Sequence, residues 1–253
     1  MNKTIMVTGA TSGFGKAIAQ KFAGNGYNTI ITGRRNDRLK DLEIELSSYK
    51  GPEILSLNFD VRNQKEVESV INNLPEKWKN IDILVNNAGL AVGMEHVDAG
   101  ILDDWERMID TNLKGLLYVS RAVLPLMVKR NSGHIINIGS IAGKEAYENG
   151  NVYCASKAAV DSLSKGMRID LLKNNIRVTH IAPGMAETEF SMVRFKGDEV
   201  KSKSVYKGID PLRAEDVAEV VFFCANLPAH VCVNDLTITA TQQASPFYSY
   251  RRV

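Results

Sequence analysis

The sequence lacks an excess of charge of either sign. Its 31 lysine and arginine residues nearly balance its 29 aspartate and glutamate residues, which leaves a formal net charge of +2 at pH 7. A surface this balanced has no extended basic field, so we expect neither a nucleic acid nor a membrane surface as a partner. Small molecules and other subunits are the expected partners.

Cysteines and long apolar runs are also scarce. Cys154, Cys224 and Cys232 are odd in number and lack metal-ligand spacing, which favours reduced thiols that pack in the interior. Even the apolar stretch VAEVVFFCA carries Glu219, so no segment is expected to span a bilayer. The apolar run at 5–7 begins too early for a signal peptide, and we therefore expect a cytoplasmic protein.

A recognisable metal site is missing as well. The four histidines are scattered, without the i, i+4 or carboxylate-flanked spacing that metal sites use. They are His96, His134, His180 and His230. We predict no metal and expect core or surface roles for these side chains.

What the sequence does contain is a regular alternation of short apolar runs and helix-period segments. Strands are predicted at 4–9, 28–33, 53–61, 81–89, 134–140, 176–184 and 235–241, and helices at 16–26, 37–49, 64–78, 103–129, around 153–157 and at 214–225. Such alternation is typical of a parallel sheet with helices on both faces, because right-handed crossovers place them there. We predict a single doubly wound α/β domain of the Rossmann type over 1–253. An irregular segment at about 183–211 suits a substrate loop, and a C-terminal tail follows at about 241–253.

A glycine-rich turn joins the first predicted strand to the first predicted helix. It reads TGATSGFG, and such a turn offers backbone N–H groups and the positive end of a helix dipole to a pyrophosphate. A turn without a ligand is the alternative, but the position after an N-terminal strand favours a dinucleotide. The candidate residues are Thr8, Gly9, Ser12, Gly13, Phe14 and Gly15.

This turn and several later motifs together resemble the short-chain dehydrogenase/reductase family. In the family's order they are TGxxxGxG at 8–15, NNAG at 86–89, Asn112 in DTNLKG, Ser140 in IGSIAG, Tyr153-x-x-x-Lys157 and PG at 183–184. They cover nearly the whole chain. The resemblance implies an oxidoreductase that uses a nicotinamide cofactor, and it implies a homotetramer.

Tyr153 and Lys157 lie four residues apart in YCASK, which puts a phenol and an ammonium on one face of a helix. We expect the Lys157 charge, together with an oxidised nicotinamide, to lower the tyrosine pKa from about 10. The resemblance implies that Lys157 also holds the nicotinamide ribose, that Ser140 orients the substrate oxygen, and that Asn112 holds a water for proton relay. Each residue alone suits an ordinary structural position, but the four together favour catalysis.

The second predicted strand ends without an acid. It runs into ITGRRNDR, so Arg34 and Arg35 stand where a site that prefers NAD carries Asp or Glu. Guanidinium groups suit a 2′-phosphate, which favours NADP(H) over NAD(H), with a solvated basic loop as the alternative. The resemblance implies further cofactor contacts at Asp60, Val61, Asn87, Ala88, Gly89, Pro183, Gly184 and Thr188.

The segment after Gly184 carries Arg194 and Lys196, which could clamp an anionic substrate or simply be solvated. The stretches ETEFSMVRFKGD, LPAHV and QQASP resemble the NADP-dependent 3-hydroxy acid dehydrogenases of the same family. Those enzymes act on serine, allo-threonine and short 3-hydroxy acids. The resemblance implies a small acidic substrate, with Arg194 at its acid group and Tyr147 in the same pocket.

The ending SPFYSYRRV adds Phe247 and Tyr248 as candidate substrate residues, in this pocket or in that of a neighbouring subunit. Its Tyr and Arg side chains also suit a sulfonate. The first alternative activity is therefore that of a related sulfoacetaldehyde reductase, which forms isethionate. The further alternatives are a general carbonyl reductase, in which Arg194 faces solvent, and a non-catalytic NADP-binding protein, which the complete set of four catalytic candidates disfavours.

Overall fold

Seven parallel strands form the centre of the protein in a computed structural model that describes residues 2–252. The strands are β1 (Thr4–Val7), β2 (Asn28–Gly33), β3 (Ile54–Asn58), β4 (Ile81–Asn86), β5 (Gly133–Ile138), β6 (Ile176–Pro183) and β7 (Asp235–Ile238). Their order in the sheet is β3-β2-β1-β4-β5-β6-β7. Met1 and Val253, the outer ends of the expected domain and tail, lie outside the described residues.

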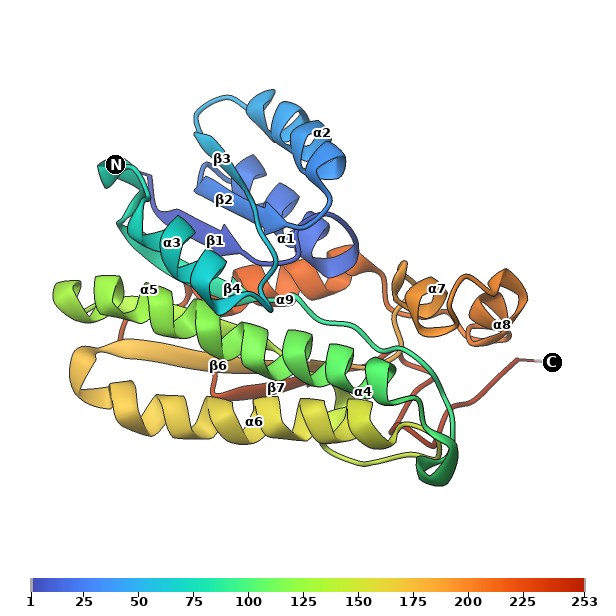
Figure 1. Ribbon diagram of the computed structural model, residues 1–253. Coiled ribbons are helices and arrows are strands. Elements are labelled where there is room, and N and C mark those ends of the chain that lie inside the picture. Colours follow the sequence, from blue (N-terminus) through green and yellow to red (C-terminus); the bar gives the residue numbers. More distant parts are fainter. Residues whose placement is uncertain (1, 253) are drawn as a thin grey trace.

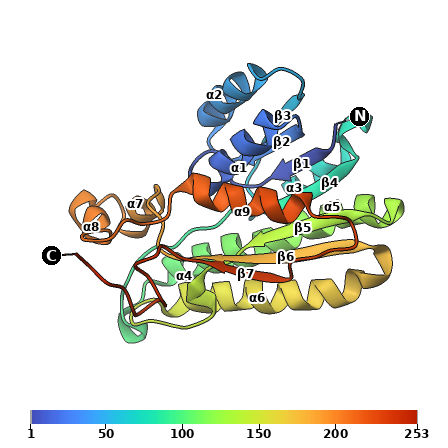
Figure 2. The ribbon, with the colours of Figure 1, turned by 180° about the vertical axis from the view of Figure 1, so that it is seen from behind.

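Helices cover both faces of this sheet, as Figures 1 and 2 show. One face carries α1 (Gly13–Gly24), α2 (Asn36–Ser47) and α9 (Ala214–Asn226), and the other carries α3 (Gln64–Asn72), α5 (Leu116–Arg130) and α6 (Asn151–Leu171). The shorter helices are α4 (Leu102–Ile109), α7 (Phe190–Arg194) and α8 (Glu199–Ser204), with 3₁₀ turns at Glu76–Trp78, Val97–Ala99, Ile141–Gly143 and Leu172–Asn174. The predicted doubly wound α/β fold is confirmed.

Side chains of the interior strand β1 point alternately into two apolar cores. Ile5 and Val7 pack in the core beneath α1 and α9, whereas Met6 packs in the core beneath α3, α5 and α6. All three are fully buried. A strand buried on both faces needs a continuous apolar sequence, which is why IMV is not an alternating pattern.

Two predicted helices differ from those observed. The helix predicted at 64–78 ends at Asn72 and resumes as a 3₁₀ turn, because Pro75 has no N–H to continue the helix. The helix predicted at 103–129 is divided by a π-helical turn at Asp110–Gly115. Buried positions recur every four residues here, at Asp104, Met108, Asn112 and Leu116. On a regular α-helix, positions four residues apart are rotated by about 40° relative to each other, so a row of them gradually leaves the buried face. The wider π-helical turn removes much of this rotation.

Within residues 2–252 no helix combines the length and the apolar character that crossing a bilayer requires. Of the four histidines, His134 and His180 are buried on β5 and β6, whereas His96 and His230 are exposed.

Candidate active site

A cavity of about 530 Å³ lies at the carboxyl ends of the strands, where parallel α/β sheets bind ligands. The loops after β1, β2, β4, β5 and β6 all contribute to its wall. The predicted residues that line it are Gly9, Ser12, Gly13, Phe14, Arg34, Arg35, Val61, Asn87, Ala88, Gly89, Ser140, Tyr147, Tyr153, Lys157, Pro183, Gly184, Thr188 and Arg194. The sequence therefore identifies residues from every one of these loops.

Two residues of the glycine-rich turn, Thr8 and Gly15, shape the turn without lining the cavity. The Thr8 hydroxyl accepts hydrogen bonds from the backbone N–H groups of Asn87 and Ala88, both at 3.0 Å. A Cβ atom on Gly15 would lie 2.3 Å from the Gly9 carbonyl oxygen. Only glycine fits there, so α1 begins directly against the turn and its free N–H groups face the cavity.

The arginines after β2 lie beside this turn. Arg35 donates to the Thr11 hydroxyl at 2.8 and 3.1 Å and to the Ser12 hydroxyl at 2.7 Å. Arg34 lies 3.5 Å from the Asp60 carboxylate, which also accepts hydrogen bonds from Arg62. Burial acts to raise the pKa of Asp60, but the Arg62 bonds outweigh it and the pKa is lowered. Asp60 is thus an ionised partner of two arginines at the rim, outside the cavity wall.

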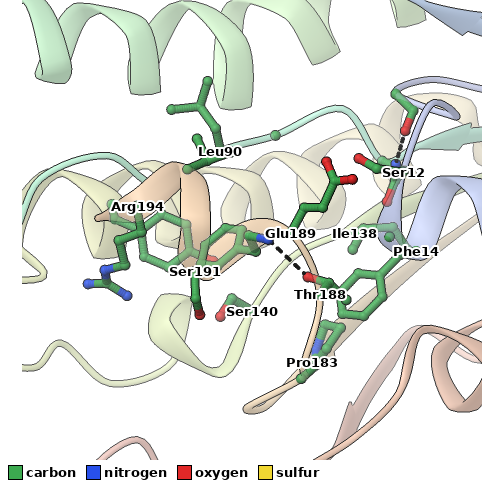
Figure 3. A pocket seen from close by; sticks show the side chains of 18 of the residues that line it. Ser12, Phe14, Leu90, Ile138, Ser140, Pro183, Thr188, Glu189, Ser191 and Arg194 are labelled. Carbon is green, nitrogen blue, oxygen red and sulfur yellow. Dashed lines mark hydrogen bonds between the residues drawn. The ribbon is translucent and has the colours of Figure 1, made fainter. Parts of the chain in front are cut away.

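At the other end of the cavity, Ser140, Tyr153 and Lys157 come together and are all at least nine-tenths buried. Lys157 donates to the carbonyl oxygen of Ile138 at 3.0 Å. The Ser140 hydroxyl accepts from the N–H of Ala142 at 3.1 Å, which holds it at the start of the 3₁₀ turn at 141–143. Figure 3 shows Ser140 and Arg194 at the same end of the cavity, away from Ser12.

Burial dominates the electrostatics of this cluster. It raises the pKa of Tyr153, opposed by the Ser140 hydroxyl and the charge of Arg194, and it lowers the pKa of Lys157 to about 8. In the chain without cofactor the Tyr153 pKa is therefore raised, and the expectation that Lys157 and an oxidised nicotinamide together lower it stays a prediction for the complex. The physical reason is that desolvation penalises both charged forms, the phenolate and the ammonium.

Asn112 lies behind the cavity wall, in the π-helical turn. Its side chain accepts from the Leu90 N–H at 2.8 Å and donates to the Leu90 carbonyl oxygen at 2.8 Å and to the Ser156 hydroxyl at 3.0 Å. A Cβ atom on Gly89 would lie 3.2 Å from the Asn112 Oδ1 atom and 3.4 Å from the Lys157 Nζ atom. Because Gly89 has no Cβ atom, space remains between the Asn112 amide and the Lys157 ammonium.

Arg194 at the end of α7 lies over two aromatic rings. Its guanidinium carbon is 5.3 Å from the centre of the Tyr147 ring and 5.6 Å from that of the Tyr153 ring. The Nε and Nη2 atoms are buried and have no hydrogen-bond partner. By contrast, the Lys196 ammonium pairs with Asp104 at 2.6 Å and does not line the cavity. Of the two predicted cations, only Arg194 offers free donors to a ligand in this cavity.

The tail folds onto the segment around α8. Arg251 donates to the carbonyl oxygens of Lys207 and Val205 at 2.7 and 3.0 Å, which leaves the Phe247 and Tyr248 side chains exposed. The structure does not bring these two side chains to the cavity. Gln243, which belongs to the stretch QQASP but has no role predicted from the sequence, lines the cavity and accepts from the N–H of Met185 at 2.7 Å.

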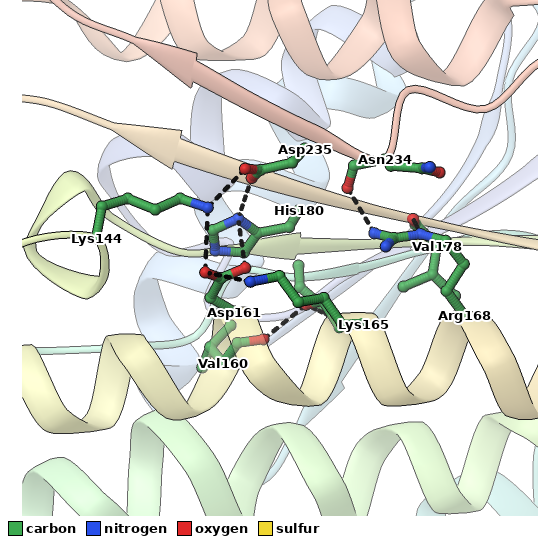
Figure 4. Close-up of polar contacts among 11 residues, drawn as sticks. Lys144, Val160, Asp161, Lys165, Arg168, Val178, His180, Asn234 and Asp235 are labelled. Carbon is green, nitrogen blue, oxygen red and sulfur yellow. Dashed lines mark hydrogen bonds and ion pairs between the residues drawn. The ribbon is translucent and has the colours of Figure 1, made fainter.

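The turn after Ser140 is tied to α6 and β7 by a cluster of charges (Figure 4). Lys144 donates to Asp161 at 3.1 Å and to Asp235 at 2.6 Å, and His180 lies 2.6 Å from Asp235. Asp161, His180 and Asp235 could together offer ligands to a metal ion. The Lys144 ammonium already supplies a positive charge between the carboxylates, so we assign the cluster to holding this turn in place.

Several lining residues are not predicted individually from the sequence, although most of them lie within the stretches on which the family resemblance rests. The most telling are Thr11, Glu189, Phe190, Ser191, Tyr206 and Gln243. They lie in the segment at about 183–211, in the tail, or at a position that the glycine pattern leaves variable. Length alone marks such a segment as a loop, but it does not show which side chains turn inward.

Comparisons with known proteins place this arrangement in context. The family model of the short chain dehydrogenases matches residues 3–199. The NADP-dependent 3-hydroxy acid dehydrogenase of Salmonella typhi is 49% identical over 249 residues, covering 98% of this chain and 99% of the relative. Sulfoacetaldehyde reductase 2 of Chromohalobacter salexigens is 48% identical over 245 residues, covering 96% of each protein.

The solved structures agree with the sequence relatives. The closed form of serine dehydrogenase complexed with NADP⁺ superposes with a TM-score of 0.93 at 49% identity, covering 99% of this chain and 100% of that one. A serine dehydrogenase from Escherichia coli gives a TM-score of 0.83 at 46% identity, covering 95% and 99%. The likeness therefore extends over the cavity, the segment after β6 and the tail.

Proposed function

Because the chain belongs to the short-chain dehydrogenase family, we propose that it is an NADP(H)-dependent oxidoreductase that interconverts a hydroxyl and a carbonyl group on a small acidic substrate. The substrate class is a 3-hydroxy acid, a serine-like carboxylate or the corresponding semialdehyde. The relatives that carry the names of an NADP-dependent 3-hydroxy acid dehydrogenase and a serine dehydrogenase support this choice.

The residues at the glycine-rich end fit NADP(H). The turn brings bare backbone and the N-terminus of α1 to the cavity, and Arg34 and Arg35 stand beside it with no acid at the end of β2. We infer that Arg35, already bonded to Thr11 and Ser12, receives the 2′-phosphate. When bound, the cofactor supplies the hydride exchange with the carbinol carbon.

The reacting end carries out the proton chemistry. We infer that the Ser140 hydroxyl holds the substrate oxygen and that the Tyr153 hydroxyl transfers the proton to or from it. A buried phenol with a raised pKa is protonated at neutral pH, which is the form that donates to a carbonyl oxygen during reduction. Lys157, with a pKa of about 8, is mostly charged at pH 7, and its ammonium and the Asn112 amide both lie next to Gly89.

The observation that carries the substrate class is the state of Arg194. Two of its buried nitrogens have no partner, and the side chain lies against the ring of the proposed proton donor. Buried guanidinium donors are costly to leave unpaired, so an acid group that accepts both N–H bonds would satisfy them. A carboxylate matches the planar fork of the guanidinium through two parallel bonds.

A sulfonate substrate is the second candidate, favoured by the 48% identity to sulfoacetaldehyde reductase 2. Its third oxygen would need a donor besides Arg194. Tyr147 lines the cavity under the Arg194 guanidinium and carries a hydroxyl group that can supply one. The free pair of donors on Arg194 makes the carboxylate our first choice.

For the assembly we propose a homotetramer in the cytoplasm. Large apolar side chains project into solvent from the covering helices, with Ile169 76% exposed on α6 and Phe223 57% exposed on α9. Exposed apolar groups on helices that already cover the sheet suit contacts between subunits. Sedimentation equilibrium of the purified protein tests this assembly, and a monomer would contradict it.

The activity is tested by NADPH oxidation with malonate semialdehyde, sulfoacetaldehyde and a neutral aldehyde of similar size, compared by kcat/KM. We expect an acid to be preferred, and Arg194→Gln to lower kcat/KM for that acid by about 10²-fold while the neutral aldehyde changes little. Lys196→Gln, which removes a cation paired with Asp104, is the matched control. Equal rates for all three aldehydes would indicate a general carbonyl reductase, and no turnover of any would indicate a non-catalytic NADP-binding protein.

A further inference from the structure

A protein carboxylate lies between two arginines at the end of the cavity that we assign to the 2′-phosphate. Glu189 accepts hydrogen bonds from Arg38 at 2.7 and 2.8 Å and from Arg35 at 3.1 Å. Glu189 and Arg35 both line the cavity. Since Arg35 is the guanidinium assigned to the 2′-phosphate, any role of Glu189 in cofactor binding rests on the proposed function.

These ion pairs are open to solvent. The side chains of Glu189, Arg35 and Arg38 are 48%, 43% and 47% exposed. Ion pairs this exposed contribute little to stability, so another anion can replace one of them at small cost. A phosphate group carries a charge of about −1.5 to −2 and three acceptor oxygens, which makes it the stronger partner for Arg35. It would also repel the Glu189 carboxylate beside it.

Glu189 is connected directly to the reacting end of the cavity. It immediately precedes α7, and the last residue of that helix is Arg194. Five helical residues span only about 7.5 Å. Phe190, the first residue of α7, packs against the Tyr153 ring with 5.6 Å between ring centres. Glu189 therefore belongs to the same short segment as the residues that touch the reacting end.

The same segment also covers the glycine-rich turn. A Cβ atom on Gly13 would lie only 3.5 Å from the Cβ atom of Thr188, so Thr188 is packed over the turn. Figure 3 shows Glu189 between Ser12 on one side of the cavity and Arg194 on the other. The segment at 188–194 thus reaches from the phosphate-binding turn to the proposed proton donor.

We propose that Glu189 competes with the 2′-phosphate of NADP(H) for Arg35, so that binding of the phosphate separates the Glu189 carboxylate from this guanidinium. A ligand without the 2′-phosphate leaves Glu189 in place. Glu189 is in this way a residue that affects cofactor specificity, because its carboxylate opposes only the cofactor that carries the 2′-phosphate.

The test compares adenosine 2′,5′-bisphosphate with AMP, which differ only in the 2′-phosphate, by calorimetric titration of the full-length protein. Glu189→Gln should tighten binding of the bisphosphate about fivefold and leave AMP unchanged. Glu187→Gln removes the same charge from an exposed position two residues away and should change neither affinity. An unchanged or weaker affinity for the bisphosphate in Glu189→Gln would overturn the proposal, as would an equal gain in Glu187→Gln. Equal affinities of the wild-type protein for the two nucleotides would instead refute the assignment of Arg35 to the phosphate, and with it both proposals.

Discussion

The guanidinium carbon of Arg194 lies 5.6 Å from the centre of the Tyr153 ring, although the two residues belong to different helices, α7 and α6. The Arg194 charge opposes the rise that burial causes in the Tyr153 pKa. An acid group bound to Arg194 would neutralise that charge and so keep the phenol protonated. Recognition of the acid and readiness to donate a proton are thereby linked through one side chain.

Tyr153→Phe should remove turnover and spare cofactor binding. The substitution deletes only the hydroxyl that we assign to proton transfer, so kcat should fall by about 10³-fold while the dissociation constant for NADPH stays within about threefold. Steady-state kinetics and fluorescence titration of NADPH measure the two effects. Tyr147→Phe removes a hydroxyl from the same cavity and should keep kcat within about tenfold. Turnover that survives in Tyr153→Phe would refute the role of this residue.

Lys157→Met should stabilise the protein without cofactor while abolishing turnover. Burial lowers the Lys157 pKa from 10.5 to about 8, so between these pH values the unfolded chain holds more protons than the folded chain. The free energy of unfolding therefore rises with pH across this window, and at pH 7 the buried ammonium costs on the order of 3 kcal/mol. Loss of the hydrogen bond to Ile138 offsets about 1–2 kcal/mol of the gain.

Thermal unfolding measures this effect. The melting temperature of Lys157→Met should exceed that of the wild-type protein by about 2–6 °C at pH 7, and the difference should shrink toward pH 10. Lys173→Met, at an exposed position, is the control and should not shift with pH in this way. A Lys157→Met protein that melts below the wild type at pH 7 would show that the ammonium stabilises the fold.

Gly15→Ala should both destabilise the protein and prevent cofactor binding. Its Cβ atom would lie 2.3 Å from the Gly9 carbonyl oxygen and 2.5 Å from the Asn87 Nδ2 atom, so the turn must move away from α1. We expect a loss of about 3 kcal/mol in the free energy of unfolding, measured with urea. Gly24→Ala has open space around its Cβ atom and should be neutral or slightly stabilising. A fully stable Gly15→Ala protein would mean that the turn is adaptable.

Asp161→Asn should weaken the turn that carries Ser140 in a manner that depends on pH. Burial acts to raise the pKa of Asp161, but hydrogen bonds from Lys165 and Lys144 outweigh it and keep the pKa below 3.8. Its contribution is therefore complete above about pH 4 and is lost as the pH falls through the folded-state pKa. We expect Asp161→Asn to cost about 2 kcal/mol at pH 7.

Urea unfolding at pH 7 and near pH 3 measures this dependence. The difference between the wild-type protein and Asp161→Asn should be present in full at pH 7 and smaller at pH 3. Asp170→Asn, an exposed position on the same helix, should change the free energy of unfolding by less than about 0.5 kcal/mol at either pH. A difference that grows toward acid would contradict the assignment.

The sequence predicts the sheet and most of the cavity because both depend on local patterns. Ile5, Met6 and Val7 read as a buried strand, and Gly9 and Gly13 read as a turn that needs bare backbone, with φ values of +66° and +50°. Such features follow from a few neighbouring residues. Their meeting at one edge of the sheet then follows from parallel topology.

Other features depend on contacts between distant segments, which no local pattern contains. Nothing in the sequence around Glu189 indicates that its side chain contacts Arg38, and nothing in YCASK indicates that Tyr153 is buried from solvent. For the same reason the sign of the tyrosine pKa shift could not be predicted from the four-residue spacing. The π-helical turn at Asp110–Gly115 could not be predicted either, because its sequence differs from that of an α-helix only in the spacing of buried residues.

That turn makes the long helix tolerant of a change that helices rarely accept. Removing one residue between 110 and 115 would let the chain close into a regular α-helix, with α4 and α5 still able to lie against their present neighbours. What such a deletion would lose is the position of Asn112, whose amide now reaches Leu90 and Ser156. A shortened protein of this kind should fold yet lack the amide beside Lys157, and it would separate the requirements of folding from those of the site.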